Sequence, residues 1–577
     1  MKRLVSMLLV LSLGLVGCSS DSSTNTGGGT STGGGTSAGG GDAVTVNGVV
    51  LDSDQYMNYS LMTDPKILDA TQTNTTTDIV ILSNATLMLT RLQMVDGALT
   101  PMPFGAASWE KSEDGMVYTF YLQEDALWED GVPVIAQHYV DSFQRTLSPE
   151  LASSASSNLT SIKNAEAIRS GDMDPSELGA KAIDDYTLEI ELEHYVAYYM
   201  DTTYNPVYSP VRLDVIEQHG SSYGVEAENV ISCGAFIVEE WVHDSHITMV
   251  KNPTYFDADN VYLEQINFKV IKDSNSIMAE LYSGNLDRSS VSSVEWREKF
   301  IENGAHNYGD YVLAGTYMMV LNTEYESNGV KIFSNEKIRQ AISAAIDRAE
   351  AVELVANGLA VPAEGIVPTT IAVDGSNYRT TSGYSPLDAH LAEDPRELFI
   401  QGLEELGADP DPSKYSINLL VRSTTAGDKD IAEYYYEVFK AAIGFSIEVQ
   451  QVESAVGLDM TKAGDFGITT VTYYSSVNDP NALLAPWVST STNNYNTSWT
   501  SAAYDEALEA ANKSTDSEER LALFKEAERI IIEEEAALIP IYHPMSSMMT
   551  AKYIYGFELE ASSFAPALFS TVYTSGR

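Results

Sequence analysis

Residues 97–149 read GALTPMPFGAASWEKSEDGMVYTFYLQEDALWEDGVPVIAQHYVDSFQRTLSP, and this stretch decides the fold. It contains the signatures G-x-x-x-P, S-W, D-G-x-x-Y-T-F-x-L and W-x-D-G-x-P-V-x-A in that order. A single block of short motifs is weak evidence for any one fold. Its interpretation therefore depends on the segments before and after it.

The chain begins with a short positive stretch and an apolar run, Leu4 to Val16. The run is shorter than the roughly 20 residues that a transmembrane helix needs, and it fits a secretory signal over residues 1–17. Leu15-Val16-Gly17-Cys18 resembles the lipobox of bacterial lipoproteins. The resemblance implies cleavage before Cys18 and acylation of that residue; the alternative is an ordinary signal peptide with a chance cysteine. Several acyl chains would anchor the protein stably to a membrane.

The signal is followed by a low-complexity segment. Residues 21–41 contain nine Gly and nine Ser or Thr. Such a composition cannot bury enough apolar surface to offset its ordering entropy. We therefore expect residues 18–41 to be a flexible tether that begins at the lipidated cysteine, with a reach of roughly 25 Å.

Charge, length and cysteine content limit the class of the remaining body. The sequence has 33 Lys and Arg against 82 Asp and Glu, a net charge of −49, which argues against binding to nucleic acid. About 535 residues follow the tether, too many for one core, so two or three lobes are expected. Only two cysteines are present, and with Cys18 lipidated Cys233 is left without an internal disulfide partner.

Strands and helices are interleaved along this body. Alternation predicts a hairpin over 234–252. An apolar face predicts one helix over 335–358, and a second helix is predicted over 515–535, with capping-box spacing from Thr515. Residues 536–544 read as a strand. This mixture indicates either a lobed α/β receptor or a hydrolase.

Catalytic and metal-binding motifs are weak. Residues 220–224 match G-x-S-x-G around Ser222, but a nucleophile elbow needs a preceding strand and the preceding segment looks helical. Residues 334–337 match S-x-x-K and are better explained as a helix start. His243 and His246 share a turn without a third metal ligand. We therefore expect no enzyme activity, no metal and no cofactor.

Several segments in order resemble one family, the extracytoplasmic solute-binding proteins of oligopeptide and dipeptide ABC importers (solute-binding protein family 5). The match covers nearly all of residues 50–560. Its segments are 97–149, 233–256, 321–348, 463–468, 478–484, 504–511, 519–531 and 539–544. Single blocks are weak evidence, whereas five or more in the family's order are strong.

The resemblance implies an α/β, two-lobed periplasmic-binding-protein-like fold (type II, cluster C) with an extra inserted domain. Domain I would comprise 42–75, 205–310 and 541–577, domain II 76–204, and domain III 311–540. Ligand would lie between the lobes and be buried by their closure. In peptide-binding members the extended ligand pairs its main chain with both lobes.

The function that the resemblance implies is capture of an oligopeptide-like solute and its delivery to the transmembrane subunits of an ABC permease. We expect a monomer, lipid-anchored to the outer face of the cell membrane. Three alternatives stay open. They are a binding protein of the same fold for a non-peptide solute, a receptor for a peptide signal, and a secreted hydrolase that uses Ser222.

Site residues follow from the family's motifs. One wall of the cleft would follow Thr63-Asp64-Pro65, and the other would precede and include the N-D-P motif at 478–480. The strand that enters domain III would add further lining residues. The expected ligand-binding residues are Asp69, Ala70, Thr71, Tyr317, Asn322, Tyr473, Tyr474, Ser475, Ser476 and Asp479.

The sequence departs from the family at one of these positions. Peptide-binding members carry an aspartate three residues before the acid of the N-[DE]-P motif, and it pairs with the ligand's α-ammonium. That position is Ser476 here, and a serine cannot supply a buried counter-charge. Either another acid, such as Asp69 or Asp479, takes this role, or the ligand has no free amine at that end.

Overall fold

The computed structural model describes residues 44–577 except 74, 96–97, 424–425, 492–494 and 558–565. The expected signal peptide, Cys18 and the tether lie outside the described residues. The chain divides into a unit that ends at Val50 and a second unit that begins at Leu51. In the first unit β1 (Thr45–Val46) pairs with β2 (Val49–Val50).

The first lobe of the second unit contains two four-stranded sheets. One sheet has the order β10-β11-β12-β3, in which β3 runs parallel to β12, and the other has the order β6-β7-β9-β8. The strands of the first sheet are β3 (Tyr56–Leu61), β10 (Phe236–Val242), β11 (His246–Lys251) and β12 (Gln265–Val270). The strands of the second sheet are β6 (Ala106–Lys111), β7 (Val117–Leu122), β8 (Ala180–Asp184) and β9 (Thr187–Glu191). A separate antiparallel pair consists of β4 (Thr90–Val95) and β5 (Ala98–Pro103).

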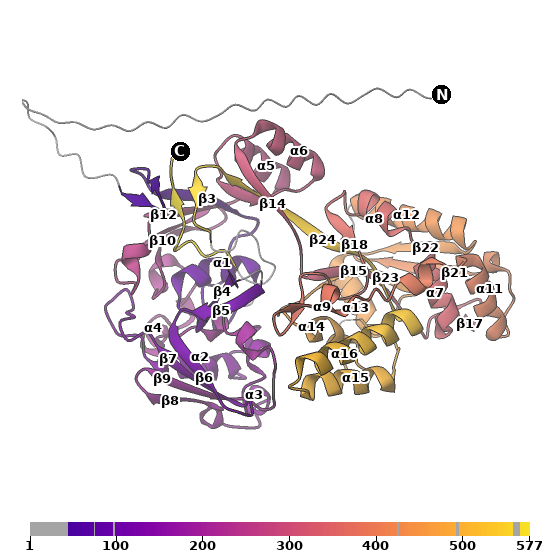
Figure 1. The fold of residues 1–577 in the computed structure, drawn as a ribbon, viewed down its shortest axis with the longest axis horizontal. Coiled ribbons are helices and arrows are strands. Elements are labelled where there is room, and N and C mark those ends of the chain that lie inside the picture. Colours follow the sequence, from indigo (N-terminus) through magenta and orange to yellow (C-terminus); the bar gives the residue numbers. More distant parts are fainter. Residues whose placement is uncertain (1–43, 74, 96–97, 424–425, 492–494, 558–565) are drawn as a thin grey trace, which may run out of the picture. The chain divides into compact units, whose positions relative to one another are not determined.

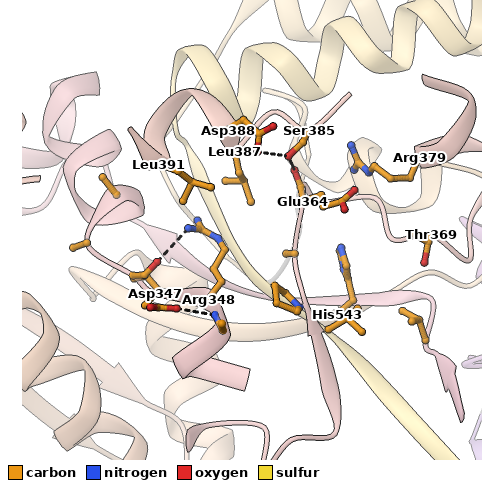
Figure 2. Close-up of a pocket in the computed structure, with 18 residues that line it drawn as sticks. Asp347, Arg348, Glu364, Thr369, Arg379, Ser385, Leu387, Asp388, Leu391 and His543 are labelled. Atoms are coloured by element: carbon orange, nitrogen blue, oxygen red, sulfur yellow. Dashed lines mark hydrogen bonds between the residues drawn. The ribbon is translucent and has the colours of Figure 1, made fainter. Parts of the chain in front are cut away.

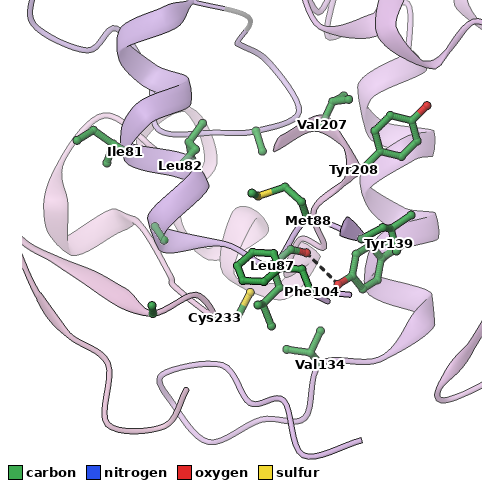
Figure 3. Close-up of a cluster of buried hydrophobic side chains, with 14 of the residues drawn as sticks. Ile81, Leu82, Leu87, Met88, Phe104, Val134, Tyr139, Val207, Tyr208 and Cys233 are labelled. Carbon is green, nitrogen blue, oxygen red and sulfur yellow. Dashed lines mark hydrogen bonds between the residues drawn. The ribbon is translucent and has the colours of Figure 1, made fainter. Parts of the chain in front are cut away.

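Helices complete the first lobe. They are α1 (Thr76–Ala85), α2 (Ala136–Leu147), α3 (Ala165–Arg169) and α4 (Leu213–His219). One apolar cluster joins both sheets to α1 and α2. In its interior the hydroxyl of Tyr139 donates to the carbonyl of Leu87 at 2.9 Å, close to Cys233 (Figure 3). Cys233 is a free, fully buried thiol, and burial raises its pKa well above the usual range.

The hairpin predicted over 234–252 is confirmed. Strand β10 pairs antiparallel with β11 from Phe236↔Lys251 to Val242↔His246. Asp244 takes a φ of 58° in the connecting turn, a conformation that Asp tolerates better than most residues. Ile247 and Met249 are fully buried, as their alternation predicts.

An eight-stranded sheet has the order β13-β24-β15-β23-β21-β22, and β14 and β18 also pair with β24. Strands β15, β18 and β21 to β23 belong to the second lobe, whereas β13 and β14 pair with the end of β24 that lies nearer the first lobe. The strands are β13 (Arg288–Ser290), β14 (His306–Val312), β15 (Gly315–Leu321), β18 (Ala360–Pro362), β21 (Ser416–Val421), β22 (Ser446–Gln451), β23 (Ile468–Tyr474) and β24 (Leu538–Ala551). Short pairs are β16 (Glu326–Ser327) with β17 (Val330–Lys331), β19 (Ala372–Val373) with β20 (Ser376–Asn377), and β25 (Ile554–Tyr555) with β26 (Tyr573–Thr574).

Strand β24 is long enough to pair with strands at both ends of this eight-stranded sheet (Figure 1). Its first half pairs with β15 and β18, and its second half, Met545–Ala551, pairs with β14. Next to that second half, the carboxylate of Asp287 accepts from the amide of Asn58 in β3 at 2.6 Å. The carbonyl of Asp287 also accepts from the amide of Ala551 in β24 at 2.8 Å, so Asp287 links β24 to the first lobe's sheet. Helices α5 (Ser274–Tyr282) and α6 (Val294–Asn303) pack on Met549.

Helices cover the remaining faces of the second lobe. They are α7 (Glu336–Ala344), α8 (Arg348–Leu354), α9 (Tyr378–Ser382), α10 (Asp388–Leu391), α11 (Pro395–Glu405), α12 (Ala426–Ala442), α13 (Ser454–Ala463), α14 (Asn481–Leu484), α15 (Ala502–Lys513) and α16 (Ser517–Glu528). Two apolar clusters occupy the core on opposite faces of β15. One includes Tyr317 and Met319, and the other includes Met318 and Val320.

The prediction of one helix over 335–358 is wrong in its middle. The segment forms α7 and α8, and the carboxylate of Asp347 caps α8 by accepting from Ala349 N at 2.9 Å and Glu350 N at 3.1 Å. The guanidinium of Arg348 donates to the carbonyl of Ser343 at 3.2 Å and to that of Pro540 in β24 at 2.9 Å. Because these bonds satisfy carbonyls at the break, the chain turns between the two helices.

The second predicted helix begins later than expected. Asp516, not Thr515, is the N-cap of α16, and it accepts from Glu519 N at 2.9 Å. The expected cap is therefore wrong by one residue, because Asp is at least as good a cap as Thr. After α16 the chain continues as a π-helix over Arg529–Glu534 and then enters β24, as the sequence predicts.

A buried ion pair fixes α16 to α9, and further hydrogen bonds fix it to the loop before α9. The side chain of Glu528 is fully buried and its Oε1 lies 2.7 Å from Arg379 Nη2. It also accepts from the amides of Ile366 at 2.8 Å and Val367 at 3.1 Å, and from the hydroxyl of Tyr378 at 3.0 Å. All these donors converge on one carboxylate, so its charge is compensated on every side.

We predict that Glu528→Gln lowers the free energy of unfolding of the second lobe by about 3–5 kcal/mol, because it leaves the Arg379 guanidinium buried without a counter-charge. Guanidinium unfolding followed by tryptophan fluorescence measures the loss. The control is Glu509→Gln, which removes an exposed partner of Lys513 and is expected to cost less than about 0.5 kcal/mol. Equal effects of the two changes would contradict the assignment.

Candidate functional site

The end of β23 forms one predicted wall. In the antiparallel pair with β15, Tyr474 lies opposite Gly315. A Cβ atom on Gly315 would lie 2.4 Å from Cδ1 of Tyr474, so only glycine allows the ring to lie there. The Tyr474 side chain is 53% exposed, Ser475 is buried and Ser476 is exposed. The glycine thus lets the strand present an accessible tyrosine next to an accessible serine.

Of the two residues predicted on β15, the structure brings only one close to this wall. Tyr317 lies opposite Thr472, and its ring stacks on Tyr542 at 4.5 Å between centroids. Asn322 follows the other end of β15, about 20 Å along the strand from Gly315. Its side-chain amide donates to the carbonyl of Gly464 at 2.7 Å, so it holds the turn at the end of α13.

The other predicted wall is a turn in the first lobe. Asp69, Ala70 and Thr71 are buried, and Asp69 Oδ1 accepts from the amide of Thr71 at 3.0 Å and from its hydroxyl at 2.7 Å. Asp69 Oδ2 lies 2.8 Å from Arg145 Nη1. The carboxylate is therefore already occupied by a turn and an arginine.

Asp479 is engaged in the same way. Its Oδ2 accepts from Arg520 Nη2 at 2.8 Å and its Oδ1 accepts from the amide of Asn481 at 2.9 Å. Both side chains of the pair are almost fully buried. Burial raises the pKa of Asp479 to about 6, although Arg520 opposes the rise. Each of the two acids suggested as a substitute at Ser476 thus has an arginine partner.

Ser476 lines a polar cavity of about 330 Å³ between the lobes. Beside the cavity, the side-chain amide Nδ2 of Asn481 donates to the hydroxyl of Tyr198 at 3.2 Å, which joins the second lobe to the first. The lining residues are Ser157, Asn158, Thr160, Ser161, His194, Val196, Tyr198, Thr202, Tyr204, Asn205, Ser476, Val477 and Ala482. Hydroxyls and amides dominate, as suits a ligand recognised by hydrogen bonds.

Asp201 is a residue that sequence reasoning missed. It lies in the 3₁₀ turn Tyr199–Thr202, next to the cavity. Desolvation, and then the negative charges of Asp479 and Asp374, raise its pKa to about 7. The available signal was the run HYVAYYMDTTY at 194–204, in which four tyrosines surround a single acid.

A second cavity, of about 860 Å³, lies within the second lobe (Figure 2). None of the predicted ligand-binding residues lines it. Arg348 and Arg379 line it, but Arg348 donates to backbone carbonyls and Arg379 pairs with Glu528. Burial, and then Arg379, lower the pKa of His543 to about 3, so this ring is neutral. The charged groups here already have partners within the fold.

The weak catalytic motifs have structural explanations. Ser222 ends a 3₁₀ turn that follows helix α4, so the strand required by a nucleophile elbow does not precede it. The hydroxyl of Ser334 donates to a backbone carbonyl before α7, and Lys337 pairs with Glu405. Within the described ranges, no three side chains are placed to hold a metal ion, and no helix has the length and apolarity to cross a membrane.

The two histidines at the hairpin turn have separate partners. His243 Nδ1 lies 2.8 Å from Asp64, and His246 Nε2 lies 3.1 Å from Glu240. The carboxylate of Asp64 raises the pKa of His243. These contacts support the interpretation of both as turn residues.

Comparison with known proteins places this geometry in a family. The middle region of the bacterial extracellular solute-binding proteins, family 5, matches residues 100–495. The chain belongs to that family. Its fold is the two-lobed α/β fold predicted from the sequence, and such proteins bind solutes outside the cytoplasm and in general are not enzymes.

Three relatives illustrate the range of the family. The dipeptide-binding protein DppE of Bacillus subtilis (strain 168) is 29% identical over 443 residues, covering 77% of this chain and 78% of that protein. The probable deoxycholate-binding periplasmic protein YgiS of Escherichia coli (strain K12) is 29% identical over 516 residues, covering 88% and 91%. The structure of Listeria monocytogenes OppA bound to peptide has a TM-score of 0.69 at 26% identity, covering 91% of this chain and all of that one.

The raised pKa of Asp201 predicts a pH-dependent cost of folding. An unfolded aspartate loses its proton near pH 3.9, whereas folded Asp201 keeps it until about pH 7, so stability falls as pH rises through this window. Asp201→Asn removes the cost. We expect the ligand-free variant to melt at a higher temperature than the wild type at pH 8, and the difference to vanish towards pH 4.

Differential scanning calorimetry of both proteins across this pH range measures the effect. Asp172→Asn, a change at an exposed acid of the same lobe, is the control and is expected to show no such trend. A difference between Asp201→Asn and wild type that does not change with pH would contradict the assignment.

Proposed function

We propose that this protein is the membrane-anchored substrate-binding protein of an ABC importer, and that it captures an oligopeptide-like solute between its lobes and delivers it to the permease. The observation that carries the proposal is the cavity at Ser476, in a chain whose relatives are named for dipeptide and oligopeptide binding. The fold contributes binding and closure, and the proposal includes no covalent step.

The mode of binding follows from the end of β23. An extended peptide can pair its main chain with exposed backbone whatever its side chains are, which gives affinity without sequence specificity. Tyr473, Tyr474, Ser475 and Ser476 would supply this wall, with Tyr317 beneath it. Ala70 and Thr71 would supply the opposite wall, and Asn322 is the expected residue with the least support.

Anchoring is part of the proposal. Acylated Cys18 would hold the protein at the outer face of the cell membrane, and residues 19–41 would leave the body free to reach the permease. The body is proposed to act as a monomer with three domains: 42–75, 205–310 and 541–577; 76–204; and 311–540.

A second candidate ligand class has one specific observation in its favour. YgiS, named a probable deoxycholate-binding protein, is as similar to this chain as DppE is, at 29% identity, and it matches more of the chain. An amphipathic steroid acid would use the tyrosines of the cleft and would not need a carboxylate at Ser476. Peptide and bile acid are therefore the two classes to test first.

Binding separates these classes. We predict that the purified body binds short peptides in calorimetry with a library of mixed sequence, and that native mass spectrometry finds copurified ligand of peptide mass. Deoxycholate is expected to bind more weakly than the tightest peptide. Binding of deoxycholate with no binding of any peptide would replace the proposal by its alternative, and binding of neither would count against both.

Anchoring is predicted to depend on Cys18. Cys18→Ser should release a folded, soluble body into the medium, because the tether carries no apolar surface to hold it. Fractionation and immunoblotting of cells that express either form measure the release. A Cys18→Ser protein that stays firmly with the membrane would show that some other feature anchors the chain.

A further inference from the structure

The 860 Å³ cavity of the second lobe has no part in the proposed function, and one histidine lies deep in its wall. His543 belongs to β24 and is 3% exposed, and its ring points into the cavity (Figure 2). Polar atoms of a side chain buried to this degree normally have hydrogen-bond partners. The contacts of its two ring nitrogens therefore indicate what an occupant of the cavity would supply.

The neighbours of Nδ1 fix the tautomer of His543. Thr316 Oγ1 lies 3.0 Å from Nδ1, and it already donates its proton to the carbonyl of Ile366 at 2.6 Å. The carbonyl of Gly315, 3.3 Å from Nδ1, can only accept. Nδ1 therefore carries the proton. Because burial lowers the pKa of the ring to about 3, the ring is neutral and Nε2 is a bare acceptor.

Nε2 is the unsatisfied atom of this ring. Both contacts of His543 within the described residues are made by Nδ1, and no group donates to Nε2. A buried acceptor without a donor is costly. An occupant of the cavity that brings one hydrogen-bond donor to Nε2 would remove this cost.

The walls of the cavity are mainly apolar. They include Val312, Ile346, Val361, Ala363, Leu387 and Leu391. Leu391 is 57% exposed, so part of this apolar surface faces solvent. The volume falls within the range of sites that hold a small organic molecule. An occupant is therefore expected to have an apolar body that packs on these walls.

Carboxylates around the cavity disfavour an anionic occupant. Asp347, Glu364 and Asp388 line the cavity and are exposed, and none of them is in a salt bridge within the described part of the chain. Arg348 adds one positive charge, but its guanidinium already donates to main-chain carbonyls. Three carboxylates against this one guanidinium leave the lining negative, so an acid would enter against the local charge.

A cation is disfavoured at the deep end for a different reason. After burial, the charge of Arg379 is the second cause of the lowered pKa of His543. The same charge acts on any cation placed against Nε2. The group that suits Nε2 is therefore neutral and carries a proton to donate. A hydroxyl meets both conditions with the smallest polar group.

We propose that this cavity is a second ligand-binding site, separate from the Ser476 cavity, and that it takes a neutral, mainly apolar alcohol or phenol whose hydroxyl donates to His543 Nε2. The body of the ligand packs on the apolar walls, and the exposed carboxylates keep out acids. The inference goes beyond the proposed function, because it requires neither peptide binding nor closure of the lobes.

Four probes that share one ring system test the ligand class by calorimetry at pH 7. They are 2-naphthol, 2-methoxynaphthalene, 2-naphthoate and 2-naphthylmethylammonium. We expect wild type to bind 2-naphthol about three- to tenfold more tightly than 2-methoxynaphthalene, which has no proton to donate, because one neutral hydrogen bond separates them. Both ions are expected to bind more weakly than 2-naphthol.

Two variants locate the site. His543→Phe keeps a ring but removes the acceptor, so the two neutral probes should bind it equally. Ala345→Trp fills the cavity from a wall residue that is only partly buried, and it should abolish binding of all four probes. This variant keeps the test decisive if His543→Phe does not fold. The matched control is Ala503→Trp at an exposed position of α15, which should bind the probes as wild type does.

Nitrogen-15 NMR of histidine-labelled protein reads out the proposed atom itself. Nε2 of His543 should give the signal of an unprotonated nitrogen. Addition of 2-naphthol should move this signal towards that of a hydrogen-bonded acceptor, and addition of 2-methoxynaphthalene should not. The His543→Phe variant assigns the signal by its loss.

Four results would overturn the inference. They are equal binding of the two neutral probes by wild type, a preference for 2-naphthol that survives His543→Phe, binding of 2-naphthol that is unchanged in Ala345→Trp, and tighter binding of either ion than of 2-naphthol. Each would leave peptide binding in the Ser476 cavity untouched. Failure of every peptide to bind would overturn the proposed function and leave this inference standing.

Discussion

The pairing of β24 with strands of both lobes is the constraint on which the rest of the structure depends. Its first half is a member of the sheet with β15 and β18, and its second half lies beside β14, where Asp287 is bonded to Asn58 of the first lobe. The chain crosses between the lobes at β14–β15 and again at β24. Two adjacent extended segments resist stretching but permit bending, which is the property that hinge closure requires.

Once the crossing is fixed, the facing surfaces are fixed as well. The end of β23 carries Tyr474 and Ser476 to the interface because Gly315 leaves room for the ring. The 3₁₀ turn at Tyr199–Thr202 carries Thr202 to the other side of the cavity. The ion pair of Asp479 with Arg520 holds the base of the second surface. In the proposed function, recognition of a ligand depends on side chains that meet because the strands between the lobes set their register.

Much of the fold could be predicted from local sequence. The hairpin over 234–252 was predictable because alternation and turn residues are properties of adjacent positions. The break between α7 and α8 was not, since it depends on Arg348 reaching the carbonyl of Pro540, almost two hundred residues away. The position of Ser476 could be predicted from its distance to the N-D-P motif, and it does line the interlobe cavity.

The rest of the candidate site could not be predicted in the same way. The sequence motifs locate Asp69 and Asp479 but do not contain Arg145 and Arg520, which form ion pairs with these two carboxylates. Nor does the local sequence around Asp201 indicate that Asp374 and Asp479 face it. Such pairings arise between segments that are distant along the chain, so a motif can place a residue at a site without giving its charge environment.

A crystal structure of the protein with a bound short peptide tests the central claim most directly. The account predicts an extended main chain between residues 194–205 and 473–481, in contact with Ser476. A peptide bound instead in the 860 Å³ cavity of the second lobe would contradict it.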